Sequence, residues 1–166
     1  RRCDDPLAEP GAGVTFSVVA PSKRAPAKPA FTPGALVGAL AKAYPDWGPT
    51  LEFSTPFELL IATILAAQAR DERINQVTAR LFKKYKGPAA FVKAPQDELE
   101  ADLRETGFYR QKALSIVTSA RIIRDRFGGT LPRTMADMRE LRGVARKTAN
   151  VVLGNAYGVT EGIAVD

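Results

Sequence analysis

The sequence predicts an all-α fold, a bundle of short helices preceded by a flexible N-terminal extension. Three observations support it: apolar residues recur three or four positions apart, helix start and stop signals bracket those stretches, and no segment alternates between apolar and polar residues. The 166 residues are 45% hydrophobic, enough for one or two small domains with a sizeable core. No internal repeat is evident. Because the predicted elements are helices, a fold of helices packed on helices is expected.

Residues 1–32 are rich in proline, alanine and glycine and have no helical period, which predicts a flexible extension. The helical core is expected over residues 33–166. Its first helix begins after Pro33 and ends near Pro45, since the residue before a proline rarely continues a helix. One face of this helix holds Leu36, Val37, Leu40 and Ala41.

The second predicted helix is the buried centre of the bundle. Thr55 is a typical N-cap, Pro56 suits the first helical position, and residues 57–67 are apolar on nearly every side. Asp71 is expected to cap the next helix. The residues of that helix expected to face the core are Ile74, Val77, Thr78, Leu81 and Phe82.

Short helical pieces are expected over residues 88–92 and 95–104, and the second carries four acidic residues that predict a solvated face. A longer helix follows from Arg110 to Phe127 and is ended by Gly128-Gly129. Its apolar stripe consists of Ala113, Ile116, Val117, Ala120, Ile123 and Phe127.

A tight basic turn joins the last two predicted helices. Thr134, with an aspartate three residues later, is a plausible N-cap for a short helix that leads into the segment Leu141-Arg-Gly-Val-Ala-Arg-Lys-Thr-Ala149. A second helix runs from Lys147 to Tyr157 and stops at Gly158. Residues of about 134–157 therefore form a predicted helix-hairpin-helix motif.

This turn has the composition of a phosphate-binding site. The N-terminus of a helix presents backbone N–H groups and a partial positive charge, and Gly143 lets the chain approach an anion closely. Arg142, Arg146 and Lys147 add three positive charges. The net charge of +6 likewise favours a polyanionic partner.

Cysteine and histidine content argues against a metal site in this chain. Cys3 is the single cysteine and there is no histidine, which excludes a disulfide framework and a four-cysteine site. No apolar run is long enough to span a bilayer, and Asp4, Asp5 and Glu9 make the N-terminus a poor export signal. A cytoplasmic protein without a membrane partner is expected.

Four separated motifs occur together: Pro56–Asp71, Gly107–Ala113, the hairpin Leu141–Ala149 and Gly162–Asp166. In this order they resemble endonuclease III, a family of the helix-hairpin-helix DNA glycosylase superfamily, from roughly Phe31 to Asp166. That family's hairpin usually reads Leu-Pro-Gly-Val-Gly, whereas this chain has Arg142 and Ala145. Arg142 could loosen the turn while adding a phosphate contact, and Ala145 is tolerable only with a negative φ or with room for its Cβ.

The resemblance implies base-excision DNA repair by a bifunctional glycosylase and abasic-site lyase. Such an enzyme removes damaged, notably oxidised, pyrimidines and cuts the strand by β-elimination; its partner is double-stranded DNA with damaged bases or abasic sites, and it is expected to be a monomer associated with the nucleoid. Lys147 matches the family's catalytic lysine and Asp166 its catalytic aspartate. An amine attacks only in its neutral form.

The resemblance also implies DNA-binding residues. Gln68 matches a glutamine that fills the gap left by a flipped base, and Phe108 falls where the family carries an apolar wedge. The alternatives are that Gln68 only caps its helix and that Phe108 packs in the core. The implied hairpin contacts are Arg142, Gly143, Val144, Ala145, Arg146 and Thr148.

The family pattern continues beyond Asp166 into another helix and usually a four-cysteine loop that holds a [4Fe-4S] cluster. The chain is therefore expected to be a fragment or a trimmed protein, without the iron-sulfur region and its ligands. Two other functions stay open. One is a monofunctional glycosylase that uses an aspartate and water, and the other is a non-enzymatic helix-hairpin-helix module that only binds DNA.

Overall fold

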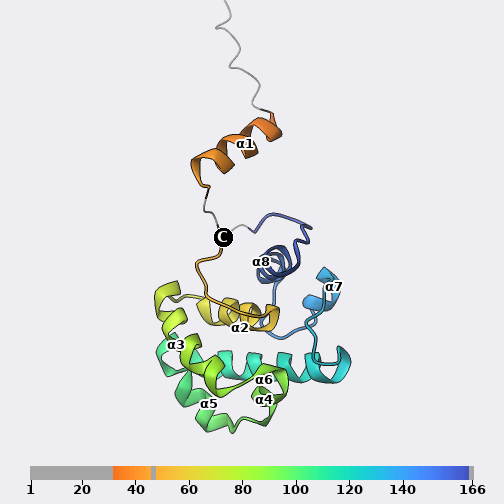
Figure 1. Ribbon diagram of the computed structural model, residues 1–166. Helices are drawn as coiled ribbons and strands as arrows, with labels where there is room; N and C mark the ends of the chain where they lie inside the picture. The colour runs from red at the N-terminus through yellow and green to blue at the C-terminus, as the bar shows by residue number, and fades with distance from the viewer. Residues whose placement is uncertain (1–31, 46–47, 165–166) are drawn as a thin grey trace, which may run out of the picture. The chain divides into compact units, whose positions relative to one another are not determined.

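The structure, a computed structural model, describes residues 32–45 and 48–164 (Figure 1). Within those residues every regular element is a helix, which confirms the predicted all-α class. The chain divides into two units, residues 1–45 and 46–166, and each is described by itself. The predicted flexible extension, residues 1–32, lies outside the described residues apart from Thr32.

The first unit contains helix α1 (Pro33–Ala43), where the sequence predicts it. Thr32 is its N-cap, and the Thr32 hydroxyl accepts a hydrogen bond of 3.3 Å from the backbone N–H of Ala35. The predicted apolar face is exposed to solvent.

In the second unit, α2 (Pro56–Ala66) is the central helix. The Thr55 hydroxyl caps it by accepting from the N–H of Glu58 at 3.2 Å, as predicted. Seven of its apolar residues are buried, and it contacts α3 (Asp71–Lys84), α4 (Gly87–Lys93), α6 (Tyr109–Arg126) and α8 (Arg146–Tyr157). Figure 1 shows α2 between α8 and α6.

One predicted cap is wrong: Asp71 does not cap α3. The N-cap position is Arg70, and the Asp71 carboxylate instead accepts a hydrogen bond from the Thr50 hydroxyl. The Asn75 side chain bonds the same loop, through the Thr50 carbonyl at 2.9 Å and the Glu52 N–H at 3.0 Å. Asp71 therefore helps to hold the preceding loop on α3. The predicted inward face of α3 is confirmed, with Phe82 half-buried and the others buried.

The acidic segment forms α5 (Gln96–Asp102) and the short 3-10 helix η1 (Arg104–Thr106), and its face is not simply solvated. The Lys84 ammonium of α3 lies 2.6 Å from Asp102 and 2.7 Å from Glu98, and the hydrogen bonds that it donates to these carboxylates raise the pKa of Lys84 above its usual value. The sequence pattern missed these partners because they lie on separate helices.

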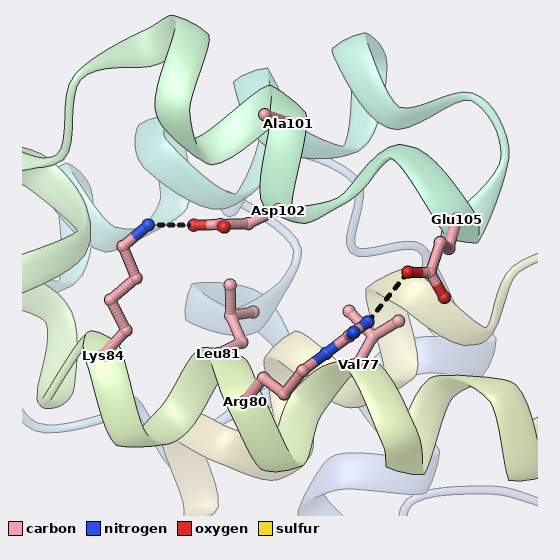
Figure 2. A pocket seen from close by; sticks show the side chains of 7 residues that line it. All are labelled: Val77, Arg80, Leu81, Lys84, Ala101, Asp102 and Glu105. Carbon is pink, nitrogen blue, oxygen red and sulfur yellow. Dashed lines mark hydrogen bonds and ion pairs between the residues drawn. The ribbon is translucent and has the colours of Figure 1, made fainter.

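Figure 2 shows the small cleft between α3 and α5, with a volume of about 210 Å³. Arg80 pairs with Glu105 at 2.9 Å, and Lys84 pairs with Asp102 across the cleft. The charged groups in this cleft neutralise one another. The cleft therefore joins two helices and offers no surplus charge to a ligand.

Helix α6 runs through the lower half of the unit and carries the predicted apolar stripe, with Val117 and Phe127 half-buried and the others buried. It ends at Gly128-Gly129, both left-handed, and the N–H groups of Phe127 and Gly129 bond the Ile123 carbonyl at 3.1 and 3.0 Å. The chain then returns through α7 (Met135–Met138) to α8, which packs on α2.

Candidate functional site

The helix-hairpin-helix motif forms where the sequence predicts it, with α7 and α8 joined by the turn of residues 139–145. The Thr134 hydroxyl caps α7 by accepting from the Asp137 N–H at 3.2 Å. Leu141 and Val144 are buried and anchor the turn in the core. The Ser119 hydroxyl of α6 donates to the Arg142 carbonyl at 2.9 Å, so the turn is also held by a hydrogen bond.

Gly143 is required at its position for two independent reasons. Its φ of +80° lies in the left-handed region. A Cβ there would also lie 3.1 Å from the Ser115 Cβ and 3.2 Å from the Ser115 Oγ of α6. A side chain at this position would therefore push the hairpin away from α6.

The two departures from the family's hairpin are accommodated. Ala145 has a φ of −87°, so the condition for an alanine there is met. Because Ala145 forms no side-chain cap, the first turn of α8 has no capping side chain for its N–H groups. Arg142 is exposed while its carbonyl is held by Ser119, and the turn stays closed despite the missing proline.

The hairpin and α8 present positive charge to solvent. Arg142, Arg146 and Lys147 are all exposed, and Thr148 is half-buried in the first turn of α8. The partial positive charge of the helix N-terminus adds to these side chains. This surface suits a phosphate group.

Lys147 and Gln68, which are far apart in the sequence, line one cleft of about 790 Å³. Its walls are the loop 48–51, the end of α2 with the turn that follows it, and the side of α8 that bears Lys147, Thr148 and Asn155. The cleft is larger than the one between α3 and α5, at about 210 Å³. The packing of α8 on α2 creates it.

A second cleft of about 340 Å³ brings together Gln68, Phe108 and Gly143. Gln68 lines both clefts, so it lies between the Lys147 side and the Phe108 side. Three separate predicted DNA-binding segments therefore converge on one region of the second unit.

Gln68 and Phe108 share an unusual backbone conformation. They are the non-glycine residues with positive φ in the described part of the chain, at 57° and 47°. Such conformations cost roughly 1–3 kcal/mol each and persist only where the surroundings enforce them. Both of these strained positions are residues that the sequence predicts to contact DNA.

The alternative for Phe108 is wrong, and the Gln68 side chain makes no hydrogen bond that caps α2 in the described residues. Phe108 is 68% exposed, so it does not pack in the core. The C-cap of α2 is Ala67, and within the described residues the Gln68 side chain donates no hydrogen bond to α2. Both side chains are available at the surface.

Sequence reasoning assigned no role to Lys112, which the structure places at the base of the second cleft. Lys112 is buried, and its ammonium donates to the carbonyls of Leu65, Ala67 and Thr106 at 2.8, 2.9 and 2.7 Å. A signal was present: Lys112 lies four positions before Ile116, on the inward stripe of α6. Burial lowers the pKa of this lysine.

Asp166, the predicted catalytic aspartate, lies outside the described residues. The segment leading to it runs against α8, since a Cβ on Gly162 would lie 3.1 Å from the Nδ2 of Asn150. Among the residues that the structure describes, no group of three or more His, Cys, Asp or Glu side chains is arranged to hold a metal ion. In the same residues no helix is both long and apolar enough to cross a membrane.

The chain is similar to known proteins over most of its length. A family model described as HhH-GPD superfamily base excision DNA repair protein matches residues 61–166. Endonuclease III of Synechocystis sp. is 45% identical over 127 residues, which cover 76% of this chain and 58% of that relative. Endonuclease III of Bacillus subtilis is 45% identical over 116 residues, 70% of this chain and 52% of that protein. The chain thus spans about half the length of these relatives.

Solved structures show the same fold. A non-covalent endonuclease III–DNA complex superposes with a TM-score of 0.74 at 44% identity and covers 79% of this chain and 61% of that one. A trapped endonuclease III–DNA covalent intermediate gives a TM-score of 0.74 at 45% identity, with 78% and 61% covered. The family match includes the hairpin, the second cleft and all of the larger cleft except the loop 48–51, and this chain belongs to the HhH-GPD superfamily of base excision DNA repair proteins.

Proposed function

We propose that this chain carries the catalytic hairpin of a bifunctional DNA glycosylase and abasic-site lyase that acts on damaged pyrimidines. The observation that carries the proposal is the large cleft, where Lys147 at the start of α8 and Gln68 after α2 face the same space. The 45% identity to endonuclease III supports it. We infer a cytoplasmic location in association with DNA, and double-stranded DNA with a damaged or missing base as the partner.

DNA binding would begin at the hairpin. Gly143 brings the backbone close to a phosphate, the first turn of α8 points N–H groups at it, and Arg142 and Arg146 supply charge. Val144 and Ala145 form the rest of the turn and contribute backbone rather than charged groups. This contact would fix the strand beside the large cleft.

A base in a duplex is reached only after it leaves the stack. Gln68 and Phe108 project from adjoining strained turns on the second cleft, which suits one side chain filling the gap and the other wedging against the opposite strand. The flipped nucleotide would then enter the large cleft, next to Lys147.

The chemistry requires an amine. The neutral Lys147 amine attacks C1′ of the damaged nucleotide, the C1′–N bond breaks, and the base departs with the bonding electrons and gains a proton. The Lys147 nitrogen then loses one proton, the C1′–O4′ bond of the sugar breaks, O4′ takes up a proton, and a protonated Schiff base forms between the nitrogen and C1′. This iminium acidifies the C2′ proton, whose removal expels the 3′ phosphate by β-elimination. Asp166 is proposed to stabilise the positive charge that develops on the sugar.

Replacing Asp166 with asparagine tests the enzymatic proposal against a binding module. The variant keeps the size of the side chain but removes its charge, so base release from a duplex with one oxidised pyrimidine is expected to fall by about 10²–10³-fold. DNA affinity, measured by fluorescence anisotropy, should change little. Unchanged single-turnover base release would contradict the role of Asp166, and an unmodified chain that binds but releases no base would favour the binding module.

Replacing Phe108 with alanine tests the wedge. Because stacking of a base on an aromatic ring is worth about 1–3 kcal/mol, the variant should bind an abasic duplex roughly 5- to 150-fold more weakly. Thermal stability should be nearly unchanged, since the side chain is 68% exposed. Leu114→Ala, which truncates an exposed apolar residue of α6, is the matched control. Equal affinities of the two variants would show that Phe108 does not stack.

The resemblance also implies a [4Fe-4S] cluster, and the donor set of this chain does not fit one. Such a cluster takes four cysteine thiolates, whereas the sequence holds only Cys3 and no histidine. No step of the proposed reaction involves the cluster.

A further inference from the structure

Lys112 is a buried cation whose partners are backbone carbonyls alone. Its side chain is 6% exposed, and in the described residues no carboxylate pairs with it. All three ammonium protons are used, on the carbonyls of Leu65, Ala67 and Thr106 at 2.8, 2.9 and 2.7 Å. A lysine in this position therefore acts as a three-way hydrogen-bond donor and not as a member of an ion pair.

The three carbonyls belong to two different turns. Leu65 and Ala67 lie at the C-terminal end of α2, directly before Gln68. Thr106 ends η1 and is followed by Gly107 and Phe108. A single ammonium thus joins the turn that carries Gln68 to the turn that carries Phe108.

Both turns have features that a hydrogen-bond donor such as the Lys112 ammonium would stabilise. The last carbonyls of a helix have no partner within the helix, and a positive charge near them is favourable. Gln68 and Phe108 both have positive φ, a conformation that persists only where the surroundings enforce it. The backbone N–H of Lys112 also donates to the Phe108 carbonyl at 3.1 Å, so Lys112 holds the Phe108 turn from two directions.

We propose that Lys112 is a positioning residue, whose ammonium sets the spacing between the Gln68 and Phe108 turns at which both side chains enter a damaged duplex. The inference rests on the proposed function, because it takes Gln68 and Phe108 to be the groups that enter the DNA. Lys112 lines the cleft between these two residues but not the cleft that holds Lys147. Its loss should therefore impair engagement of a duplex more than the amine chemistry at Lys147.

The test compares an abasic site in a duplex with the same site in a single strand. A single strand has no opposite base and no stacked gap, so it does not require the two turns to be correctly spaced. In Lys112→Met, borohydride trapping on the duplex should slow by about 10²-fold, the loss expected for a misplacement near 1 Å, and trapping on the single strand by less than about threefold. Lys112→Gln, which keeps two donors, should lose less.

Lys93→Met is the matched control, because it removes one positive charge from an exposed site on α4. It should trap both substrates at the unmodified rate. An equal slowing of both substrates by Lys112→Met and Lys112→Gln, or no slowing of either, would overturn the positioning role. Circular dichroism of each variant shows whether it is folded.

Amide hydrogen exchange of the DNA-free protein tests the tie independently of activity. In Lys112→Gln the amides of Ala69 and Thr106, which bond within the two turns at 3.0 and 2.9 Å, should exchange at least about tenfold faster, while amides in the middle of α6 keep their rates. Unchanged exchange in both turns would show that the Lys112 ammonium does not hold them together. If the unmodified chain traps no DNA but the two turns exchange faster in Lys112→Gln, the proposed function fails, while the role of Lys112 in holding the two turns together is supported.

Discussion

Replacing Lys147 with alanine is expected to lower strand cleavage at an abasic site by at least about 10³-fold, because the variant has no amine to form the Schiff base. Lys147 is exposed in the first turn of α8, so the substitution should change the free energy of unfolding by less than about 0.5 kcal/mol. The affinity for the abasic duplex should fall only slightly, because the variant loses a single positive charge. Single-turnover cleavage, followed with an end-labelled duplex, measures the effect.

Lys83→Ala is the matched control for this variant. Lys83 is an exposed lysine of α3, away from both clefts, and its removal lowers the net charge by the same amount. Cleavage by Lys83→Ala should stay within about twofold of the unmodified chain at low salt, where surface charge has its greatest effect. Cleavage by Lys147→Ala at the rate of this control would mean that another nucleophile acts.

Replacing Gly143 with alanine is expected to destabilise the protein and weaken DNA binding together. The φ of +80° alone should cost about 1–2 kcal/mol, and the contact of 3.1 Å with the Ser115 Cβ adds to it. At about 2–4 °C for each kcal/mol, the backbone cost alone should lower the Tm by roughly 2–8 °C. A displaced hairpin should also lose its phosphate contact, and affinity for duplex DNA should fall by about tenfold or more.

Gly154→Ala is the control for Gly143→Ala. Gly154 lies within α8, and the nearest atom to an added Cβ is the Val159 carbonyl oxygen at 4.0 Å. Alanine there should stabilise the helix by up to about 1 kcal/mol. Thermal unfolding and fluorescence anisotropy follow both variants. A Gly143→Ala protein as stable as the unmodified chain would contradict the proposed tight packing of the hairpin on α6.

Local signals in the sequence were enough for most of the fold. Thr55 before Pro56, Gly128-Gly129 and the apolar stripe of α6 act within a few residues, and each marks an element that the structure contains. Asp71 shows the limit of such signals. An acid at a helix start resembles a cap in sequence, but the nearby Thr50 hydroxyl becomes its partner once the loop packs on α3.

The arrangement of the candidate site depends on tertiary packing and could not be predicted from periodicity. That Lys147 and Gln68 share a cleft follows from the packing of α8 on α2. The positive φ of Gln68 and Phe108 is not encoded by their residue types, since glutamine and phenylalanine rarely adopt it. The position of Lys112 on the inward stripe of α6 indicated burial, but its role could not be predicted, because its partners are carbonyls, which carry no sequence signature.

The central claim is that the Lys147 amine forms a covalent intermediate with an abasic sugar. The most direct test is to incubate the chain with a duplex that contains one abasic site, reduce with borohydride, digest the adduct and locate the modified residue by mass spectrometry. The account predicts that the sugar is attached to Lys147, in a peptide from the start of α8. Attachment to a different amine, or an undiminished adduct in Lys147→Ala, would contradict it.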